Sequence, residues 1–209
     1  MKDALLQYYP LAEITSLLDR GAPIVSPHKN ESALIIAATH MRNDLVSLLL
    51  DREADVNMLV GNNKTALTAA AYQGNTDTVR LLLDRGADVN MVGGEFGTAL
   101  AAAAFRKKES TVTLLLRRGA DANRVGGKYG TALAAAAYKG NIQTMSLLLR
   151  RGADVNMVGG HYGTALAAAV CRKLSFSLRS TVSLLLDRGA DVNMVSGHYG
   201  TALPSCGCV

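Results

Sequence analysis

The chain has 209 residues, of which 49% are hydrophobic and 5% aromatic, with no tryptophan and a formal net charge of +5 at pH 7. This charge is too modest to indicate a nucleic-acid-binding protein, although it would favour an acidic partner. The three cysteines do not predict a disulfide framework, and we expect a reducing compartment. The first residues do not resemble a signal peptide, and no uncharged apolar run reaches the roughly 18 residues of a membrane span.

An internal repeat dominates the sequence. A Thr-Ala-Leu triplet recurs at a spacing of 33 residues, and the last copy follows after 37 residues. The triplets begin at Thr65, Thr98, Thr131, Thr164 and Thr201, and Ser32 stands one period before the first. Such a period is typical of a solenoid, in which each unit buries its apolar face only against its neighbours. We therefore predict an all-α helical solenoid with short β-hairpin fingers and about six helix pairs.

The predicted array is a single domain over residues 1–203, followed by a tail at 204–209. Residues 1–21 end in the same Leu-Leu-Asp-Arg-Gly text as later units but carry only a short helix before it, so we interpret them as a degenerate first unit. Full helix pairs are predicted at 32–53, 65–86, 98–119, 131–152 and 164–189.

Each unit begins with a candidate helix cap. The hydroxyl of Thr98 can accept a hydrogen bond from the first turn of a helix over 99–105. Alanine dominates this helix and lets neighbouring helices approach closely. The second helix carries Val112 and three consecutive leucines at 114–116, which suits packing against both flanking units.

A glycine follows the second helix in most units, where a left-handed residue commonly ends a helix. These glycines are Gly86, Gly119, Gly152 and Gly189. Glu53 occupies this place in one unit, where a non-glycine residue should cost roughly 1 kcal/mol. Paired glycines at 93–94, 126–127 and 159–160 then predict a hairpin turn between short strands, which we call a finger.

The unit at 164–189 departs from this pattern. The stretch CRKLSFSLR at 171–179 contains four extra residues between the two helices, which predicts a loop at one edge of the array. A further unit starts at Thr201, but Pro204 and Gly207 end it at once. We therefore expect the leucines at 184–186 to be partly uncovered.

These residues resemble the ankyrin-repeat family. The matching text is T-A-L-x-x-A-A, a Gly-Asn turn and L-L-L-D-R-G-A-D-V-N, repeated over about residues 11–203. The G-x-Y-G-T-A-L form of the unit is similar to arrays in fungal proteins. The resemblance implies a hairpin and two antiparallel helices per unit, with protein binding on the concave face. It implies no chemistry, since a fold does not by itself define a catalytic site.

Two columns of the repeat vary while the framework stays constant, one at the end of the first helix and one on the fingers. The resemblance places both columns on the concave face. The predicted partner-binding residues are Tyr72, Phe105, Arg106, Tyr138, Lys139 and Arg172 in the first column, and Phe96, Tyr129, Tyr162 and Tyr199 in the second. Aromatic residues and arginine are common interface anchors, so this surface suits an extended or acidic protein segment. The alternative is that the finger aromatics only brace each finger against the next.

The sequence carries no arrangement typical of an enzyme or a metal site, and we predict no catalysis, no cofactor, no metal and no small-molecule substrate. Asp55, Asp88, Asp121, Asp154 and Asp191 recur once per unit and are interpreted as structural. His161 and His198 lack nearby cysteines that could complete a zinc site. Cys206 formally begins a C-a-a-X sequence, but the next two residues are not aliphatic, so a frayed tail is the favoured interpretation.

The leading functional interpretation is a non-catalytic adaptor that binds a protein segment and resides in the cytoplasm, with the nucleus as the other location. The alternative is a truncated array of a larger signalling protein, with a structural role or self-association through its uncapped C-terminal face. Nucleic-acid association through Arg106, Lys139 and Arg172 ranks last, because the basic residues are dispersed among Asp and Glu.

Overall fold

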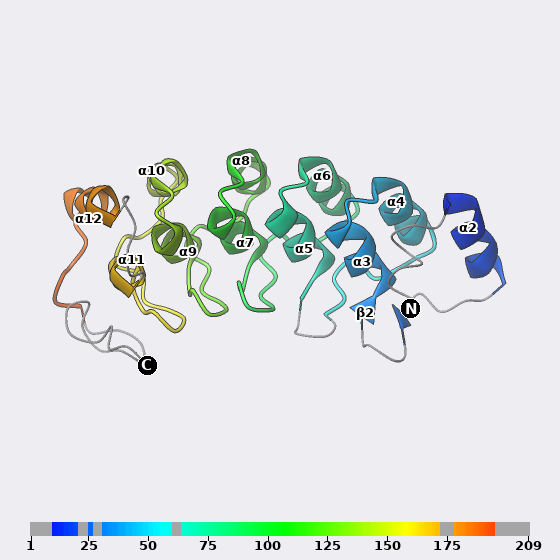
Figure 1. Ribbon diagram of the computed structural model, residues 1–209, viewed down its shortest axis with the longest axis horizontal. Coiled ribbons are helices and arrows are strands. Elements are labelled where there is room, and N and C mark those ends of the chain that lie inside the picture. The colour runs from blue at the N-terminus through cyan, green and yellow to red at the C-terminus, as the bar shows by residue number, and fades with distance from the viewer. Residues whose placement is uncertain (1–9, 21–24, 27–30, 60–63, 172–177, 195–209) are drawn as a thin grey trace.

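The computed structural model describes residues 10–20, 25–26, 31–59, 64–171 and 178–194. Helices follow one another in antiparallel pairs that stack side by side along one axis (Figure 1). The pairs are α3 (Ala33–Thr39) with α4 (Asn43–Asp51), α5 (Ala66–Gln73) with α6 (Thr76–Asp84), α7 (Ala99–Phe105) with α8 (Glu109–Arg117), α9 (Ala132–Lys139) with α10 (Ile142–Arg150), and α11 (Ala165–Cys171) with α12 (Leu178–Asp187). The single helix α2 (Leu11–Asp19) precedes them. This arrangement confirms the predicted helical solenoid.

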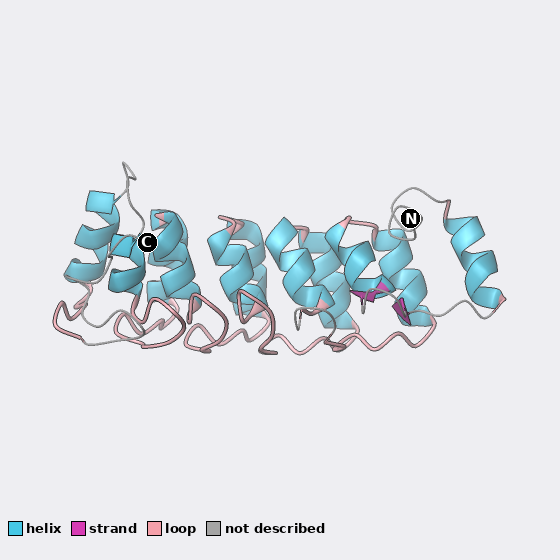
Figure 2. Cartoon of the chain, turned by 60° about the horizontal axis from the view of Figure 1, so that its bottom comes forward, coloured by secondary structure: helices cyan, strands magenta, loops and turns pink. Residues whose placement is uncertain are grey.

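The first helices of the pairs form one layer and the second helices form the other (Figure 1). The loops that join successive pairs lie along one edge of the array (Figure 2). Strands β1 (Val25–Ser26) and β2 (Glu31–Ser32) form an antiparallel hairpin in the first of these loops. No described helix is long and apolar enough to cross a membrane.

Threonine caps the first helix in four of the five described pairs, as the sequence predicted. The hydroxyl of Thr98 accepts a hydrogen bond from the Ala101 N–H at 3.1 Å, and its side chain is buried. The same bond forms at Thr65, Thr131 and Thr164. Each cap satisfies one of the backbone donors that a helix leaves free at its N-terminus, so the start of the first helix is set locally.

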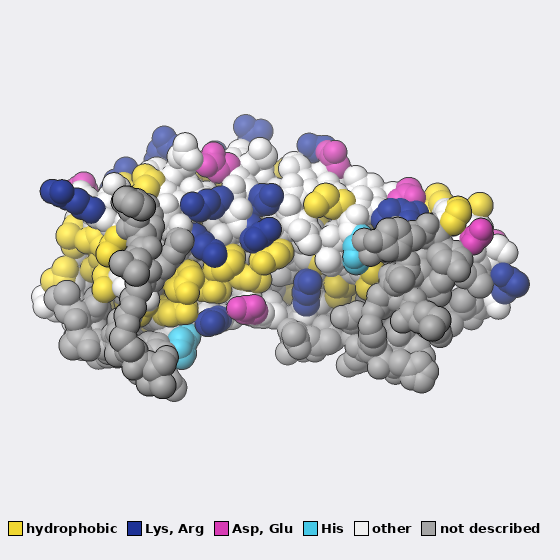
Figure 3. Space-filling model, viewed as in Figure 1, with side chains coloured by type: hydrophobic (Ala, Val, Ile, Leu, Met, Phe, Trp, Pro, Cys, Tyr) yellow, Lys and Arg dark blue, Asp and Glu magenta, His cyan; other side chains and the backbone are white. Residues whose placement is uncertain are grey.

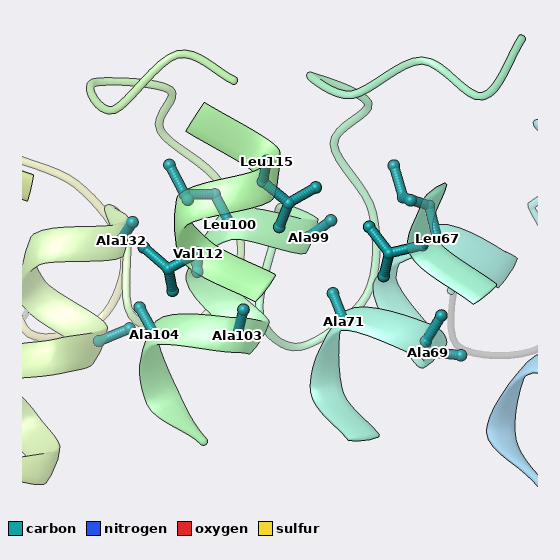
Figure 4. Packing of buried hydrophobic residues seen from close by; sticks show 14 of the residues in the cluster. Leu67, Ala69, Ala71, Ala99, Leu100, Ala103, Ala104, Val112, Leu115 and Ala132 are labelled. Atoms are coloured by element: carbon teal, nitrogen blue, oxygen red, sulfur yellow. The ribbon is translucent and has the colours of Figure 1, made fainter. Parts of the chain in front are cut away.

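Alanine fills the layer of first helices. Ala71, Ala104 and Ala132 lie on successive helices and are buried, with Val112 and Leu115 of α8 packed nearby (Figure 4). Because alanine ends at Cβ, neighbouring helices can approach more closely than leucine would allow. In each second helix of a pair the middle leucine of the triplet is fully buried. Its two neighbours are partly buried against the same core, except Leu186 of α12, which is exposed.

A row of asparagines joins the loops of successive repeats. The side chain of Asn90 donates to the carbonyl of Gly119 at 3.1 Å and accepts from the Asp121 N–H at 2.7 Å. Asn57, Asn123 and Asn156 repeat the same pair of bonds one repeat apart. We call this row the asparagine ladder. It fixes the position of each loop relative to the next, in addition to the packing of the helices.

The fingers differ from the prediction of paired strands. In the described glycine-rich fingers the backbone forms only isolated bridges, Gly126 with Gly130 and Gly159 with Gly163. The reason is local, because each finger spans few residues and its closing glycine adopts a positive φ, as Gly130 does at 77°. A true strand pair occurs instead in the first loop, which has no paired glycines.

The sequence analysis did not predict a disulfide bond, but Cys171 at the end of α11 is disulfide-bonded. This bond gives no support to the expectation of a reducing compartment. Residues 172–177 of the loop that contains the insertion, and the tail that contains Cys206, lie outside the described residues.

Glu53 occupies the left-handed position that glycine takes in the other units. Its φ is 61°, and Gly86, Gly119, Gly152 and Gly189 have φ between 84° and 88°. We predict that Glu53→Gly raises stability by about 1 kcal/mol, because it removes the steric cost of a Cβ in this conformation. Thermal unfolding should show a melting temperature a few degrees higher.

Gly119→Ala is the matched control for that change. A Cβ at Gly119 would meet no atom within 4 Å, so only the backbone conformation is penalised. This variant should lose about 1 kcal/mol. An unchanged or lower melting temperature for Glu53→Gly would contradict the register that we assign to the repeat.

We predict that Asn90→Ala destabilises the array by about 1–2 kcal/mol, because two hydrogen bonds between repeats are lost. Urea unfolding would measure the change. Asn193→Ala is the control, since no hydrogen bond of the Asn193 side chain is found within the described residues. Equal effects of the two substitutions would show that the ladder contributes nothing specific.

Candidate functional site

The fingers stack on one another through their backbones. The Lys128 N–H donates to the Glu95 carbonyl at 2.7 Å, and the His161 N–H donates to the Lys128 carbonyl at 2.7 Å. Gly97 is required at this contact, because its φ is positive and a Cβ there would overlap the backbone of Gly126. The glycines therefore allow successive fingers to pack backbone to backbone, which brings their aromatic residues into line.

Six aromatic rings form a continuous row along four consecutive repeats, which we call the aromatic zipper. Its members are Tyr72, Phe96, Phe105, Tyr129, Tyr138 and Tyr162. Rings from the ends of the first helices alternate with rings from the fingers, at centroid separations of 5.0, 4.9, 4.8, 5.1 and 5.0 Å. These separations are within the range of favourable aromatic pairs. Phe96 and Tyr129 therefore each lie between the helix rings of two adjacent repeats, and Tyr162 contacts the helix ring of Tyr138 at the C-terminal end of the row.

Tyr129 lies at the centre of the zipper and is only 4% exposed. Burial raises the pKa of its phenol to about 12, with smaller contributions from Tyr138 and Glu95. Its ring therefore offers little surface to a partner. Phe96, Phe105 and Tyr138 are half-buried, so parts of these rings remain accessible.

Basic side chains cover the zipper from the next repeat. The Arg106 guanidinium carbon lies 4.7 Å from the ring centroid of Tyr72, and the Lys139 Nζ lies 4.2 Å from that of Phe105. Each cation thus reaches back by one repeat onto an aromatic face, a favourable cation–π geometry. Lys128 Nζ lies 6.0 Å from the ring of Tyr129, at the limit of this interaction.

A pocket of about 230 Å³ opens at the N-terminal end of the zipper. Its lining residues are Lys64, Thr68, Tyr72, Gly94, Glu95 and Phe96. The pocket thus combines two aromatic rings with one basic and one acidic side chain. It is large enough for a side chain but below the usual size of a small-molecule site.

Comparison with known proteins identifies the repeat. A family model described as ankyrin repeats, three copies, matches residues 6–92 and 98–196. The chain belongs to the ankyrin-repeat family. Ankyrin repeats are a protein–protein interaction module, so the expected partner of this array is a protein.

A solved structure supports the same assignment. The ankyrin array is similar to the ankyrin repeat domain of Bcl-3, described as a unique member of the IkappaB protein family. The TM-score is 0.73 and the identity 25%, over 99% of this chain and 93% of that chain. No curated protein sequence matches this chain.

The ankyrin array brings together most residues of the predicted binding set. Hydrophobic side chains gather over α7 and α9 and the adjoining fingers, with Lys and Arg side chains beside them (Figure 3). We call this surface the finger face. Its residues from the predicted set are Tyr72, Phe96, Phe105, Arg106, Tyr129, Tyr138, Lys139 and Tyr162. Arg172 and Tyr199 lie outside the described residues.

Five residues of this surface were absent from the predicted binding set, including Gly94 and Glu95 of the pocket. Lys64 and Thr68 line the pocket, and Lys128 approaches the zipper. Lys128 lies in the variable finger column next to Tyr129, so the sequence variation in that column could have identified it as a surface residue. Lys64 and Thr68 lie outside both variable columns, so only the fold shows that they line the pocket.

The recurring aspartates occupy loop turns rather than a catalytic arrangement. The Asp88 carboxylate accepts a hydrogen bond from the Asn90 N–H at 2.8 Å, within its own loop. Asp55, Asp121, Asp154 and Asp191 make the same contact. Among the described residues, no group of three or more His, Cys, Asp or Glu side chains could hold a metal ion.

The raised pKa of Tyr129 predicts a loss of stability at alkaline pH. The unfolded chain releases this phenolic proton near pH 10, whereas the folded ankyrin array holds it until about pH 12. The stabilisation is therefore complete below about pH 10 and is lost as the pH rises towards 12. Urea unfolding from about pH 9 to 12 should show a shallower decline for Tyr129→Phe than for the natural protein. Parallel curves would contradict the raised pKa of the Tyr129 phenol.

Proposed function

We propose that this ankyrin array is a non-catalytic adaptor that binds an extended, acidic segment of a partner protein on its finger face. The observation that carries the proposal is the aromatic zipper covered by Arg106 and Lys139. Apolar rings next to exposed cations form the kind of mixed surface that anchors protein interfaces.

The zipper is pre-organised, which reduces the cost of binding. Each ring contacts at least one other ring, and Tyr72 and Phe105 are also covered by a cation, so few rotamers of the rings remain to be ordered. Immobilising a flexible side chain costs about 0.5–1.5 kcal/mol, and a rigid surface avoids much of that cost. A partner segment can therefore bind without reorganising the array.

The charge of the finger face favours acidic partners. Arg106, Lys107 and Lys128 are exposed, and Lys139 is half-buried. Glu95 is the exposed acidic residue beside them, at the end where the pocket opens. Carboxylates of the partner would pair with the cations, and an apolar or aromatic side chain would enter the pocket against Tyr72 and Phe96.

Selection from a random peptide library displayed on phage tests this proposal. We expect enrichment of peptides that combine an aromatic residue with neighbouring Asp or Glu. For a selected peptide, the paired substitution Arg106→Ala and Lys139→Ala should weaken binding by about 1–3 kcal/mol, measured by calorimetry. Gln143→Ala is the control, because Gln143 is exposed on α10, away from the zipper.

Two results would contradict the proposal. Enriched peptides without acidic residues would remove the charge argument. Equal losses in the paired variant and in Gln143→Ala would place the binding surface elsewhere on the array.

The second candidate function is assembly through the C-terminal end of the array. Leu186 of α12 is 44% exposed, whereas the corresponding Leu83, Leu116 and Leu149 are partly buried. An exposed leucine at the last described helix favours a further apolar contact. Light scattering over a range of concentrations decides between the two, because self-association raises the apparent mass. The cytoplasmic or nuclear location stays a prediction.

A further inference from the structure

Ion pairs link the second helices of successive repeats in the first half of the array. In each case the aspartate that ends one second helix pairs with an arginine just after the next. The pairs are Asp19 with Arg52 at 2.8 Å, Asp51 with Arg85 at 2.8 Å, and Asp84 with Arg118 at 2.7 Å. The same contact therefore recurs at three consecutive junctions.

The next two junctions replace the aspartate with arginine. Arg117 ends α8 and Arg150 ends α10, just as Asp84 ends α6. The following arginines, Arg151 and Arg188, keep their places. All four side chains are exposed, and none forms an ion pair within the described part of the chain. We call these two positions the arginine junctions.

The neighbouring repeats are otherwise almost identical in this region. The text L-L-L-D-R-G-A-D at 81–88 becomes L-L-L-R-R-G-A-D at 114–121 and 147–154. A cation at a helix C-terminus interacts favourably with the helix dipole, so α8 and α10 can end in arginine without loss of helix stability. The helix dipole does not explain why two junctions carry a pair of arginines where the other three carry one arginine and one aspartate.

We propose that the arginine junctions bind an acidic segment of a partner protein, whose carboxylates take the places that Asp51 and Asp84 occupy at the earlier junctions. The chemistry is that of the observed pairs, in which a guanidinium donates to a carboxylate at hydrogen-bonding distance. Two arginines per junction provide more donors than one carboxylate needs, so each junction can bind a carboxylate from outside.

The spacing of the repeats defines the segment. Neighbouring helices in a stack lie roughly 8–10 Å apart, and an extended chain advances about 3.3 Å per residue. Carboxylates at every third position of an extended segment would therefore match successive junctions. An acidic segment with Asp or Glu at positions i and i+3 fits this surface.

One observation favours a protein segment over a nucleic acid. Every aromatic residue of the described part belongs to the zipper on the finger face, so the arginine junctions offer no ring on which a base could stack.

This site is distinct from the finger face, because it lies at the ends of the second helices rather than on the first helices and fingers (Figure 1). If the arginine junctions bind no acidic segment, the proposed function of the finger face is unaffected. The test must therefore separate the two surfaces.

Binding of a fluorescein-labelled peptide with Glu at every third position, measured by anisotropy at low salt, tests the inference. The double variant R117D/R150D restores the aspartate–arginine pattern of the earlier junctions. We expect it to stay folded by circular dichroism and to bind the peptide at least about tenfold more weakly. The matched finger-face variant R106D/K139D makes the same change in net charge and should keep the affinity for this peptide within about twofold.

A gain-of-function variant checks the same idea in the opposite direction. D84R creates a third arginine junction, with Arg118 as its second member. We expect it to bind the peptide several-fold more tightly. The peptide with Gln in place of Glu should bind none of the proteins measurably.

Three results would overturn the inference. The double variant R117D/R150D could bind the peptide as well as the natural protein, or R106D/K139D could lose binding instead. The third is tighter binding of an oligouridylate, lost in R117D/R150D, which would assign the arginine junctions to nucleic acid.

Discussion

The contact between one repeat and the next is the interaction on which the rest of this structure depends. Alanine helices pack closely across it, and the asparagine ladder ties each loop to the following one through two hydrogen bonds. A single repeat can satisfy neither requirement, because the partner groups lie about one period further along the chain. Stability therefore comes from the junctions rather than from isolated units.

The surface features have the same origin. Phe96 contacts Tyr72 of the preceding repeat and Phe105 of its own, and Arg106 reaches back to Tyr72. The zipper and its cations therefore exist only while adjacent repeats are stacked. The arginine junctions are also a property of pairs of repeats, since Arg117 and Arg151 come from neighbouring units. Binding at either surface should stabilise the stack, because a ligand that binds only the folded state favours folding.

The periodic part of the structure could be predicted from the sequence, and the contacts between periods could not. The helix cap at Thr98 depends only on local backbone, so residue type and position predicted it. The left-handed conformation of Glu53 is also local, and its position in the repeat predicted it. The alternation of rings, by contrast, depends on how a finger lies against two helices. The position of Lys64 in the pocket could not be predicted either, because it also depends on how a finger packs against the helices. The disulfide bond of Cys171 could not be predicted from the number and spacing of three cysteines.

Hydrogen exchange on the free protein, resolved by helix, tests most directly the claim that junctions hold the array together. Helices α7 and α9 have described repeats stacked on both sides, whereas α2 and α12 have a described repeat on one side only. We expect the amides of α7 and α9 to exchange slowest and at similar rates, with faster exchange towards α2 and α12. Exchange in α7 as fast as in α12, or a slow helix between two fast neighbours, would contradict the account.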